Sequence, residues 1–384
     1  MFPRVGTLPP GPRVGTLPPG PLDAITDVGG VLVGHTTLIS GDGPLRRGAG
    51  PVRTGVTVIR PHGGSLAREP LFAGYHVLNG NGEMTGLSWL TESGLLTSAI
   101  GLTNTHSVGV VRDELAMIEA AAFPDPGNRW FMPVVAETWD GVLNDIDGGH
   151  VRAGHTRAAF DAAAGGSVPQ GGVGGGTGMI CHGFKGGIGS SSRIVDTPAG
   201  AFTVGVLVQA NHGRRERFQV DGVPVGRLVG ADVVPLPGKP AGADVVPLPG
   251  EASGAEPGAG SIVGIVATDA PLLPHQCRRL AQRAALGLAR TGGAGEHSSG
   301  DLFLAFSTGS RGVPADLNGV AAAPLYQVTV LHNQAITGLF EAVIEATEQA
   351  IVNAVVAART MVGRDGNTAH AAGPHVAAAL ARRL

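Results

Sequence analysis

Cysteine is scarce in this chain of 384 residues, which contains only Cys181 and Cys277. The two stand far apart and neither is part of a CxxC pair. This spacing predicts neither a disulfide framework nor a zinc site built on paired thiolates. We therefore expect a reducing, cytoplasmic location.

A large excess of positive or negative charge and long apolar runs are lacking as well. The formal net charge is −3 and the isoelectric point is about 6.5, so there is no basic stripe of the kind that nucleic-acid binding usually shows. No segment offers about 18 uninterrupted apolar residues, and the N-terminus lacks an apolar core of signal-peptide length. We expect neither a nucleic-acid partner nor a membrane partner.

Motifs for metals and for two common catalytic sites are also missing. The 13 histidines form no HExxH and no Cys/His pairs at finger spacing, and no carboxylate-rich calcium loop is present. A GxSxG elbow, which would present the serine of an α/β-hydrolase, does not occur either. We expect no metal and no cofactor, and a nucleophilic serine would need another means of activation.

Glycine, in contrast, is abundant, with 63 residues, while aromatic residues make up 4% of the chain. The usual share of glycine is about 7%. A hydrophobic content of 43% is enough to bury a large core, filled here by Ala, Val, Leu and Ile. The glycines indicate tight turns and close approaches of the backbone.

Two short duplications punctuate the chain. PRVGTLPPG occurs at 3–11 and 12–20, and GADVVPLPG at 230–238 and 242–250. Neither reaches the roughly three copies that a repeat fold needs. We predict a Pro/Gly-rich tail over 1–22, a mobile linker over about 229–260 and a single folded domain over 23–384.

Strand-like and helix-like patterns alternate without a regular βαβ rhythm. Apolar, β-branched runs predict strands within 55–61, 97–110, 132–139, 201–211, 261–268, 301–308 and 326–332. Helices are predicted from Pro274 to the glycine pair at 292–293 and over 339–363. The mixture favours a layered α/β fold over a doubly wound Rossmann sheet.

The stretch GGVGGGTGMICHGFKGGIGSSSR, 171–193, allows two interpretations. Successive N–H groups of a Gly-rich turn can hold phosphate, and GGGTG resembles the signature loop of tubulin-like GTPases. The stretch has no Lys-Ser/Thr of a P-loop, and no GxGxxG opens a helix after a strand. Close backbone packing is the alternative, with Lys185 and Arg193 as structural or rim charges.

The junction at Gly260–Ser261 joins a Gly/Ala/Pro-rich segment to the apolar run IVGIVAT. Ser261 is either an ordinary polar residue at a strand edge or a nucleophile. An N-terminal serine can be activated by its own α-amine, whose pKa is about 7.7–8.0. That chemistry requires cleavage of the Gly260–Ser261 bond, and a glycine leaves the attacked carbonyl sterically open.

Three further polar groups stand at strand ends. Ser299 and Asp301, two apart before an apolar strand, face the same way in an extended backbone, and their alternative role is capping a turn. Asn211 ends a predicted strand and offers an amide N–H₂ to an oxyanion, or else tolerates a left-handed turn. Glu137, near Asp140 and Asp145, offers a carboxylate for a substrate ammonium, or is simply solvated.

The ordered set of motifs resembles the family of L-aminopeptidase D-Ala-esterase/amidases and β-peptidyl aminopeptidases. The similar stretches span about residues 25–365 and are ITDVGGVLVGHTTL, GPVRTGVTVIRP, LNGNGEMTGLSW, LTNTHSVG, PVVAETWDGVLNDI, GGVGGGTGM, FKGGIGSSSR, LVQANHG, GSIVGIVATDAPLLPHQ and SSGDLFLAFST. The resemblance implies an αββα sandwich like that of N-terminal nucleophile hydrolases. It also implies a precursor that cuts itself into 1–260 (α) and 261–384 (β), and a homo-oligomer of αβ pairs.

The resemblance also implies site residues. By position, Ser261 matches the nucleophile, and Gly260–Ser261 matches the cleavage site. Ser299 and Asp301 match its hydroxyl and carboxylate partners, Asn211 the oxyanion donor, and Glu137 the acid that receives the substrate amine. Trp139, which we predict to contact the substrate together with Glu137, stands where some members have a tyrosine that reaches into the site, so this chain lacks that hydroxyl.

We therefore predict a self-processing serine aminopeptidase that acts on short peptides, amino-acid amides or esters. Two other functions remain open from the residues: an acyltransferase similar to glutamate N-acetyltransferase, and a nucleotide-binding protein that uses GGVGGGTG. A non-catalytic descendant that keeps the fold without processing is a third. The preference for L-, D- or β-amino acyl groups is left open.

Overall fold

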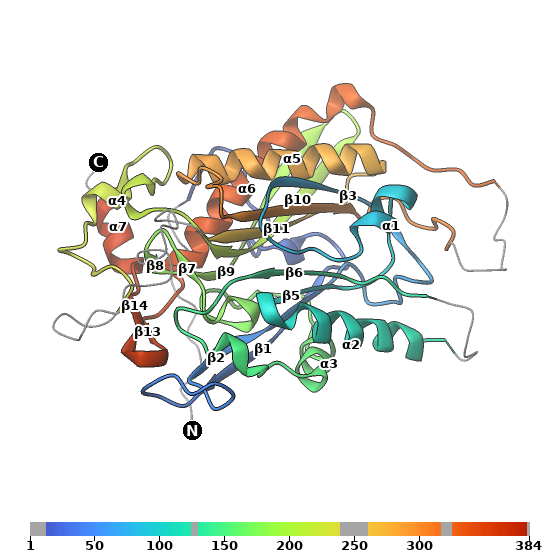
Figure 1. The fold of residues 1–384 in the computed structure, drawn as a ribbon. Coiled ribbons are helices and arrows are strands. Elements are labelled where there is room, and N and C mark those ends of the chain that lie inside the picture. The colour runs from blue at the N-terminus through green and yellow to red at the C-terminus, as the bar shows by residue number, and fades with distance from the viewer. Residues whose placement is uncertain (1–12, 124–129, 239–259, 316–324, 382–384) are drawn as a thin grey trace.

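The computed structural model describes residues 13–123, 130–238, 260–315 and 325–381. Two β-sheets lie face to face, and helices cover the outer face of each (Figure 1). The predicted αββα sandwich is confirmed. Of the described helices, none combines the length and apolar character needed to cross a bilayer.

The larger sheet has six strands in the order β4-β3-β12-β11-β10-β9. Strand β11 lies in its interior, antiparallel to β10 and parallel to β12. The bounds are β3 Leu71–Gly80, β4 Leu95–Leu96, β9 Gly187–Thr197, β10 Gly200–Asn211, β11 Ser261–Thr268 and β12 Gly300–Ser307.

Helices α5, Pro274–Arg290, and α6, Thr337–Val356, cover the outer face of this sheet (Figure 1). Pro274 is the first residue of α5, where proline has no hydrogen bond to lose. The side chains of Leu280, Ala284 and Leu288 are buried on one face, as their spacing predicts.

The smaller sheet has the order β1-β2-β5-β6, with β5 and β6 parallel. Helices α2 and α3 cover its outer face (Figure 1). The bounds are β1 Leu32–Ser40, β2 Val52–Arg60, β5 Ile100–Asn104, β6 Val134–Thr138, α2 Val108–Ala121 and α3 Ala153–Asp161. The shorter elements are α1 Leu87–Ser93, α4 Val225–Leu228, α7 Gly373–Ala381, β7 Ile180–Cys181, β8 Phe184–Lys185, β13 Met361–Val362 and β14 Thr368–Ala369.

Strand β11 shows why an uninterrupted apolar run is needed in this fold. Ile262 and Val266 belong to the core under α5 and α6, while Val263 and Ile265 belong to the core between the sheets. Both faces of the strand are therefore buried, because successive side chains project to opposite faces and each face packs against a core. The Ser261 side chain is on the same face of β11 as Val263 and projects into the space between the sheets.

Three of the predicted elements differ in the structure. Residues 326–332 form no strand, since they pair with no described strand and Leu325 beside them is 86% exposed. The run 97–110 is a strand only over β5, because α2 begins at Val108. Helix α6 ends at Val356, short of the predicted residue 363.

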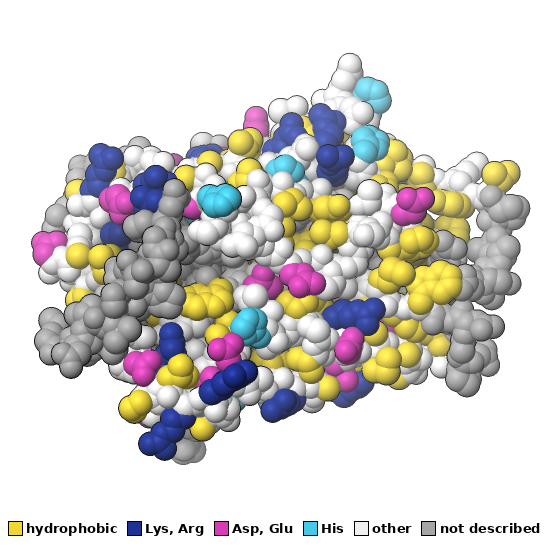
Figure 2. Space-filling view, in the orientation of Figure 1, with side chains coloured by type: hydrophobic (Ala, Val, Ile, Leu, Met, Phe, Trp, Pro, Cys, Tyr) yellow, Lys and Arg dark blue, Asp and Glu magenta, His cyan; other side chains and the backbone are white. Residues whose placement is uncertain are grey.

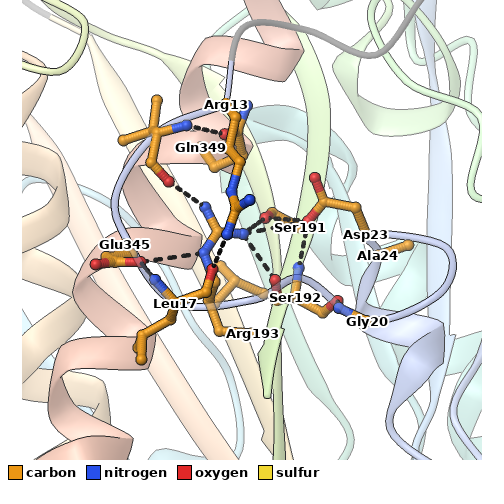
Figure 3. Close-up of polar contacts among 12 residues, drawn as sticks. Arg13, Leu17, Gly20, Asp23, Ala24, Ser191, Ser192, Arg193, Glu345 and Gln349 are labelled. Atoms are coloured by element: carbon orange, nitrogen blue, oxygen red, sulfur yellow. Dashed lines mark hydrogen bonds and ion pairs between the residues drawn. The ribbon is translucent and has the colours of Figure 1, made fainter. Parts of the chain in front are cut away.

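The predicted tail is too long, because residues 13–22 pack against the body. Val14 is fully buried, and the backbone of this segment accepts and donates hydrogen bonds at Arg193, Ser192 and Glu345. Figure 3 shows Arg193 enclosed by the segment, with Asp23 on one side and Glu345 on the other. Arg193 is thus a structural charge and not a rim charge.

The predicted linker also begins later than expected. Val229 and Val234 are buried, and the Arg215 side chain donates hydrogen bonds to both of their carbonyls. Residues 229–238 therefore belong to the packed body. The remainder of the linker, 239–259, lies outside the described residues.

Candidate active site

Ser261 is the first residue of β11 and is 6% exposed. Its Oγ accepts a hydrogen bond from the Gly300 N–H on the neighbouring strand, at 3.1 Å. The Ser261 hydroxyl therefore lies at the end of an interior strand, on the face that the smaller sheet covers. Such a position fixes a nucleophile better than a loop would.

Asn211 lies directly opposite Ser261 in the antiparallel pair β10–β11. Opposite residues of such a pair project to the same face, so both side chains look into the inter-sheet space. Asn211 Oδ1 accepts from the Ile180 N–H at 2.8 Å, and Nδ2 donates to the Trp139 carbonyl at 2.9 Å. These two bonds fix which end of the amide is the donor and leave it a second N–H.

Ser299 and Asp301 lie side by side, as their spacing predicts. Ser299 Oγ donates to Asp301 Oδ1 at 2.6 Å, and both side chains are buried. Burial raises the pKa of Asp301 to about 6. Oδ2 has no hydrogen-bond partner among the described residues, so this carboxyl keeps capacity for one more donor.

The register between β11 and β12 shows on which face of the sheet the Asp301 side chain lies. Ser261 is aligned with Gly300, and Ile262 with Asp301. Asp301 therefore shares the face of Ile262, opposite to the Ser261 side chain. The Asp301 carboxyl and the Ser261 hydroxyl therefore lie on opposite faces of the sheet.

Glu137, near the end of β6, is 3% exposed. Its Oε1 accepts from the Glu83 N–H at 2.9 Å, and its Oε2 accepts from the Thr105 hydroxyl. Burial raises the pKa of Glu137. The side chain is thus fixed, with a carboxylate charge that burial makes costly and that a cation would stabilise.

Gly82 lies between Glu137 and the start of β12. A methyl group placed on Gly82 would lie 3.3 Å from Glu137 Oε1 and 3.1 Å from Gly300 Cα. Gly300 is the first residue of β12, and its N–H donates to Ser261 Oγ, so Gly82 lies between the Glu137 carboxylate and the residue that binds the Ser261 hydroxyl. This proximity distinguishes Glu137 from Asp140 and Asp145.

Asp140 and Asp145 have structural partners. Asp140 accepts hydrogen bonds from the side chains of Asn104 and Asn144. Asp145 accepts from two backbone N–H groups of the loop at 48–50 and contacts the imidazole of His150. Both acids hold the loops around the end of β6.

Trp139 contributes its backbone to the site, because its carbonyl receives Asn211 Nδ2. The indole packs over Gly141, where a methyl group would lie 2.3 Å from the ring. The tryptophan therefore packs on its own loop and supplies no hydroxyl.

Gly260 is required by close packing. A methyl group on this residue would lie 2.0 Å from the Asn211 carbonyl oxygen and 3.2 Å from His212 Cα. The residue before Ser261 is therefore pressed against the end of β10. This contact holds the Gly260–Ser261 bond beside Asn211.

The Gly-rich stretch is packed and does not form a phosphate cradle. The N–H groups of Gly174 and Gly175 donate to Thr37 and Thr57, and those of Gly176 and Thr177 donate to carbonyls of the same turn. Added methyl groups at residues 174–176 would lie 2.2–2.4 Å from neighbouring atoms. The donors that a nucleotide would need are already used.

Lys185 braces this stretch. Its ammonium is fully buried and donates to the carbonyls of Gly176, Met179 and Gly186. Burial lowers the pKa of Lys185 to about 7. The loop that it braces carries Ile180, whose N–H orients Asn211.

Sequence reasoning missed the groups that support the site: the N–H groups of Gly300, Glu83 and Ile180, and the hydroxyl of Thr105. Backbone donors leave no mark in a sequence. Of these groups, only Gly300 could have been suspected from the sequence, because it stands between Ser299 and Asp301 at the start of an apolar run.

Comparison with known proteins agrees with this architecture. Residues 23–369 match peptidase family S58. The β-peptidyl aminopeptidase BapA of Sphingosinicella microcystinivorans is 47% identical over 346 residues, 90% of this chain and 84% of that protein. Two solved structures have TM-scores of 0.84: a Burkholderia sp. β-aminopeptidase, 50% identical and covering 96% of each chain, and the L-aminopeptidase D-Ala-esterase/amidase of Ochrobactrum anthropi. The latter is 39% identical, with 97% of each chain covered, and is described as a serine aminopeptidase with a variant of the Ntn hydrolase fold.

The four-layered fold and these matches define a hydrolase of the Ntn type that works as a serine aminopeptidase. The chain belongs to peptidase family S58. The resemblance seen in the motifs is thereby confirmed.

Proposed function

We propose that the chain cuts itself at Gly260–Ser261 and that the new N-terminal Ser261 is the nucleophile of the aminopeptidase. The placement of Ser261 supports this most directly. It stands at the start of an interior strand, with Asn211 opposite and the Gly300 N–H on its hydroxyl. An ordinary strand-edge serine needs none of these partners.

The first reaction is an attack within the chain. Ser261 Oγ adds to the Gly260 carbonyl, the C–N bond breaks, and the nitrogen takes the hydroxyl proton to become a free amine. The resulting ester between Gly260 and Ser261 is then hydrolysed by water. Gly260 becomes a carboxylate at the end of the α piece, 1–260, and Ser261 starts the β piece, 261–384.

Peptide cleavage repeats this chemistry on a bound substrate. The α-amine of Ser261 takes the proton of Oγ as it attacks the substrate carbonyl, and gives it to the leaving amine. The second N–H of Asn211 stabilises the oxyanion. Asp301, with Ser299 on its other oxygen, receives the α-ammonium at Oδ2. Water then releases the acyl group.

Glu137 selects substrates with a free amine at the N-terminus. Its buried carboxylate pairs with the substrate ammonium, while Thr105 and the Glu83 N–H keep it in place. Two relatives are named as β-peptidyl aminopeptidase and β-aminopeptidase. We therefore infer that short peptides and amides with an N-terminal β-amino acid are substrates. Their cleavage rates are to be compared with those of the corresponding L-amino acid amides.

The test is the intact mass under denaturing conditions of the wild-type protein, of Ser261→Ala and of Ser40→Ala. Ser40 is an exposed serine at the end of β1 and serves as the control. Wild type and Ser40→Ala should give two pieces with a new N-terminus at Ser261. Ser261→Ala should stay whole and inactive, and a cut or active Ser261→Ala protein would refute the assignment.

Assembly and location are further parts of the proposal. The segment 325–332 leaves Leu325, Tyr326, Val328 and Val330 exposed and pairs with no described strand of its own chain. Such a segment suits contact with a second αβ pair. Figure 2 shows charges of both signs over the face viewed, apart from a small basic group over α5. We propose that the protein forms a homo-oligomer, and light scattering of the purified protein tests this. We also propose that it is located in the cytoplasm, and cell fractionation tests that location.

A further inference from the structure

A cluster of potential metal ligands lies behind Asn211 and plays no part in the proposed mechanism. Cys181, His182 and His212 each place one ligand atom within 4.8 Å of the other two, and all three side chains are buried. Cys181 and His182 are adjacent in the chain, and His212 follows Asn211. No metal motif appears in the sequence, because the fold brings the third residue in.

The backbone turns in an unusual way to assemble this cluster. His182 and Gly183 form the two-residue connection of the hairpin β7–β8, with φ values of +48° and +67°. Such turns require positive φ at both positions and favour Asn-Gly, so a histidine at the first position is uncommon. A straight strand would send the side chains of Cys181 and His182 to opposite faces.

Two ring nitrogens of the cluster lack a hydrogen-bond partner within the part of the chain that the structure describes. Nε2 of His182 and Nε2 of His212 are buried and have no hydrogen-bond partner among the described residues. His182 Nδ1 lies 3.3 Å from the Arg214 carbonyl, the kind of contact that orients a metal-bound imidazole. A buried nitrogen without a partner costs free energy, and a metal ion on His182 Nε2 would remove that cost there, while His212 would bind through Nδ1, the nitrogen that lies near Cys181 Sγ.

We propose that Cys181, His182 and His212 bind one zinc ion. A thiolate and two imidazoles are ligands that zinc prefers, and a fourth position remains for water. Cys181 Sγ and His212 Nδ1 are 3.9 Å apart, while sulfur and nitrogen on a tetrahedral zinc ion are about 3.5 Å apart. Binding therefore needs a shift of a few tenths of an ångström, and the thiol proton is released to solvent.

The ion would brace the end of β10. The His182 N–H donates to the His212 carbonyl at 2.6 Å, and His212 Cα lies against Gly260. Zinc on His212 therefore holds the turn, Asn211 and the residue before the cleaved bond as one unit. This is a structural role, separate from the metal-free chemistry of Ser261.

Metal content tests the proposal whether or not the chain is cut. The full chain is produced in medium supplemented with zinc, or with cobalt in parallel, and bound metal is measured after purification. The variants are Cys181→Ala and His182→Asn, with Cys277→Ala as the control. Asn is the residue that the turn favours, so His182→Asn keeps the backbone while it removes the imidazole. Cys277 is also a fully buried thiol but lies outside the cluster.

Wild type and Cys277→Ala should each retain about one ion per chain. Cys181→Ala and His182→Asn should retain at least about tenfold less. The cobalt form should show a thiolate charge-transfer band that Cys181→Ala lacks. If the Cys181→Ala protein fails to fold, the metal content of the His182→Asn protein decides whether the proposal holds. Equal metal in wild type and His182→Asn, or no metal in wild type, would overturn the proposal.

Discussion

Two buried polar clusters in this molecule differ in how completely their atoms are paired. Around Arg193, the guanidinium bonds to Asp23, Ser191, Glu345 and the carbonyls of Val14 and Ser192 (Figure 3). Around Ser261, Asp301 Oδ2 and one N–H of Asn211 still have room for a donor or an acceptor. The fully paired cluster around Arg193 stabilises the fold, whereas the cluster around Ser261 still has polar atoms that could bind a ligand.

The two buried carboxyls show the same difference. Burial alone would raise the pKa of Glu345, but hydrogen bonds from Thr16, Leu17 and Arg193 outweigh it, and the pKa is lowered. At Asp301, burial dominates and raises the pKa to about 6. Buried acids with raised pKa values are candidates for function, whereas saturated ones are structural.

The largest effect on stability is expected from Arg193→Met. Removing one partner of a buried ion pair leaves charge unpaired and costs about 3–5 kcal/mol, here at Asp23 and Glu345. Denaturant unfolding should be measured in the Ser261→Ala background, so that a single chain unfolds. Arg112→Met, whose partner Asp113 is exposed, is the control and should change stability little.

A loss below about 1 kcal/mol would contradict the structural role assigned to Arg193. In the otherwise wild-type protein, the folded fraction of Arg193→Met should keep its kcat, because the guanidinium does not touch the site.

The next effect is expected from Asn211→Ala, which removes the proposed oxyanion donor. The loss should be about 10²–10³ in kcat, with slower self-cleavage, because both reactions pass through an oxyanion on the same carbonyl position. Initial rates and the cut fraction over time are measured together. Asn353→Ala, which removes a donor to the Ser190 carbonyl in the helix-covered core, should leave the rate of the folded enzyme unchanged. A normal rate in Asn211→Ala would remove Asn211 from the site.

The smallest effect concerns Asp301 and pH. Its pKa is about 6 when folded and about 3.9 when unfolded. Because the folded value is the higher one, its contribution to stability is fully present below about pH 3.9 and is lost as pH rises through about 6. In the Ser261→Ala background, Asp301→Asn should therefore gain stability relative to its parent between pH 4 and pH 6.

Urea unfolding across this pH range measures that difference. The exposed Asp196→Asn should run parallel to the parent at every pH. A stability difference that does not change with pH would mean that Asp301 titrates normally. With the serine restored, Asp301→Asn should lower activity even though it is the more stable protein.

The sequence predicted the centre of the molecule better than its edges. Strands β10, β11 and β12 are apolar on both faces, and α5 has a proline at its start, so their patterns were plain. Strand β9 was missed because its interior carries Ser190, Ser191 and Ser192, which are buried by hydrogen bonds to the N-terminal segment. Such a pairing depends on residues about 170 positions away, which no local pattern reports.

The site residues were predictable only in part, for a similar reason. Ser261, Asn211, Ser299, Asp301 and Glu137 were named from their types at strand ends, and the fold brings Asn211, Gly300 and Ser261 into contact. Which face Asp301 occupies depends on the register between β11 and β12.

The order of the large sheet has a consequence for the cut protein. If the chain is cut at Gly260–Ser261 as proposed, strands β11 and β12 belong to the second piece, and they lie between β10 and β3, which belong to the first. After cleavage the hydrophobic core becomes a subunit interface, and two separate molecules share one sheet. Thermal unfolding of the processed protein should then follow mass action, with a midpoint that rises with protein concentration, while Ser261→Ala unfolds at a temperature independent of dilution.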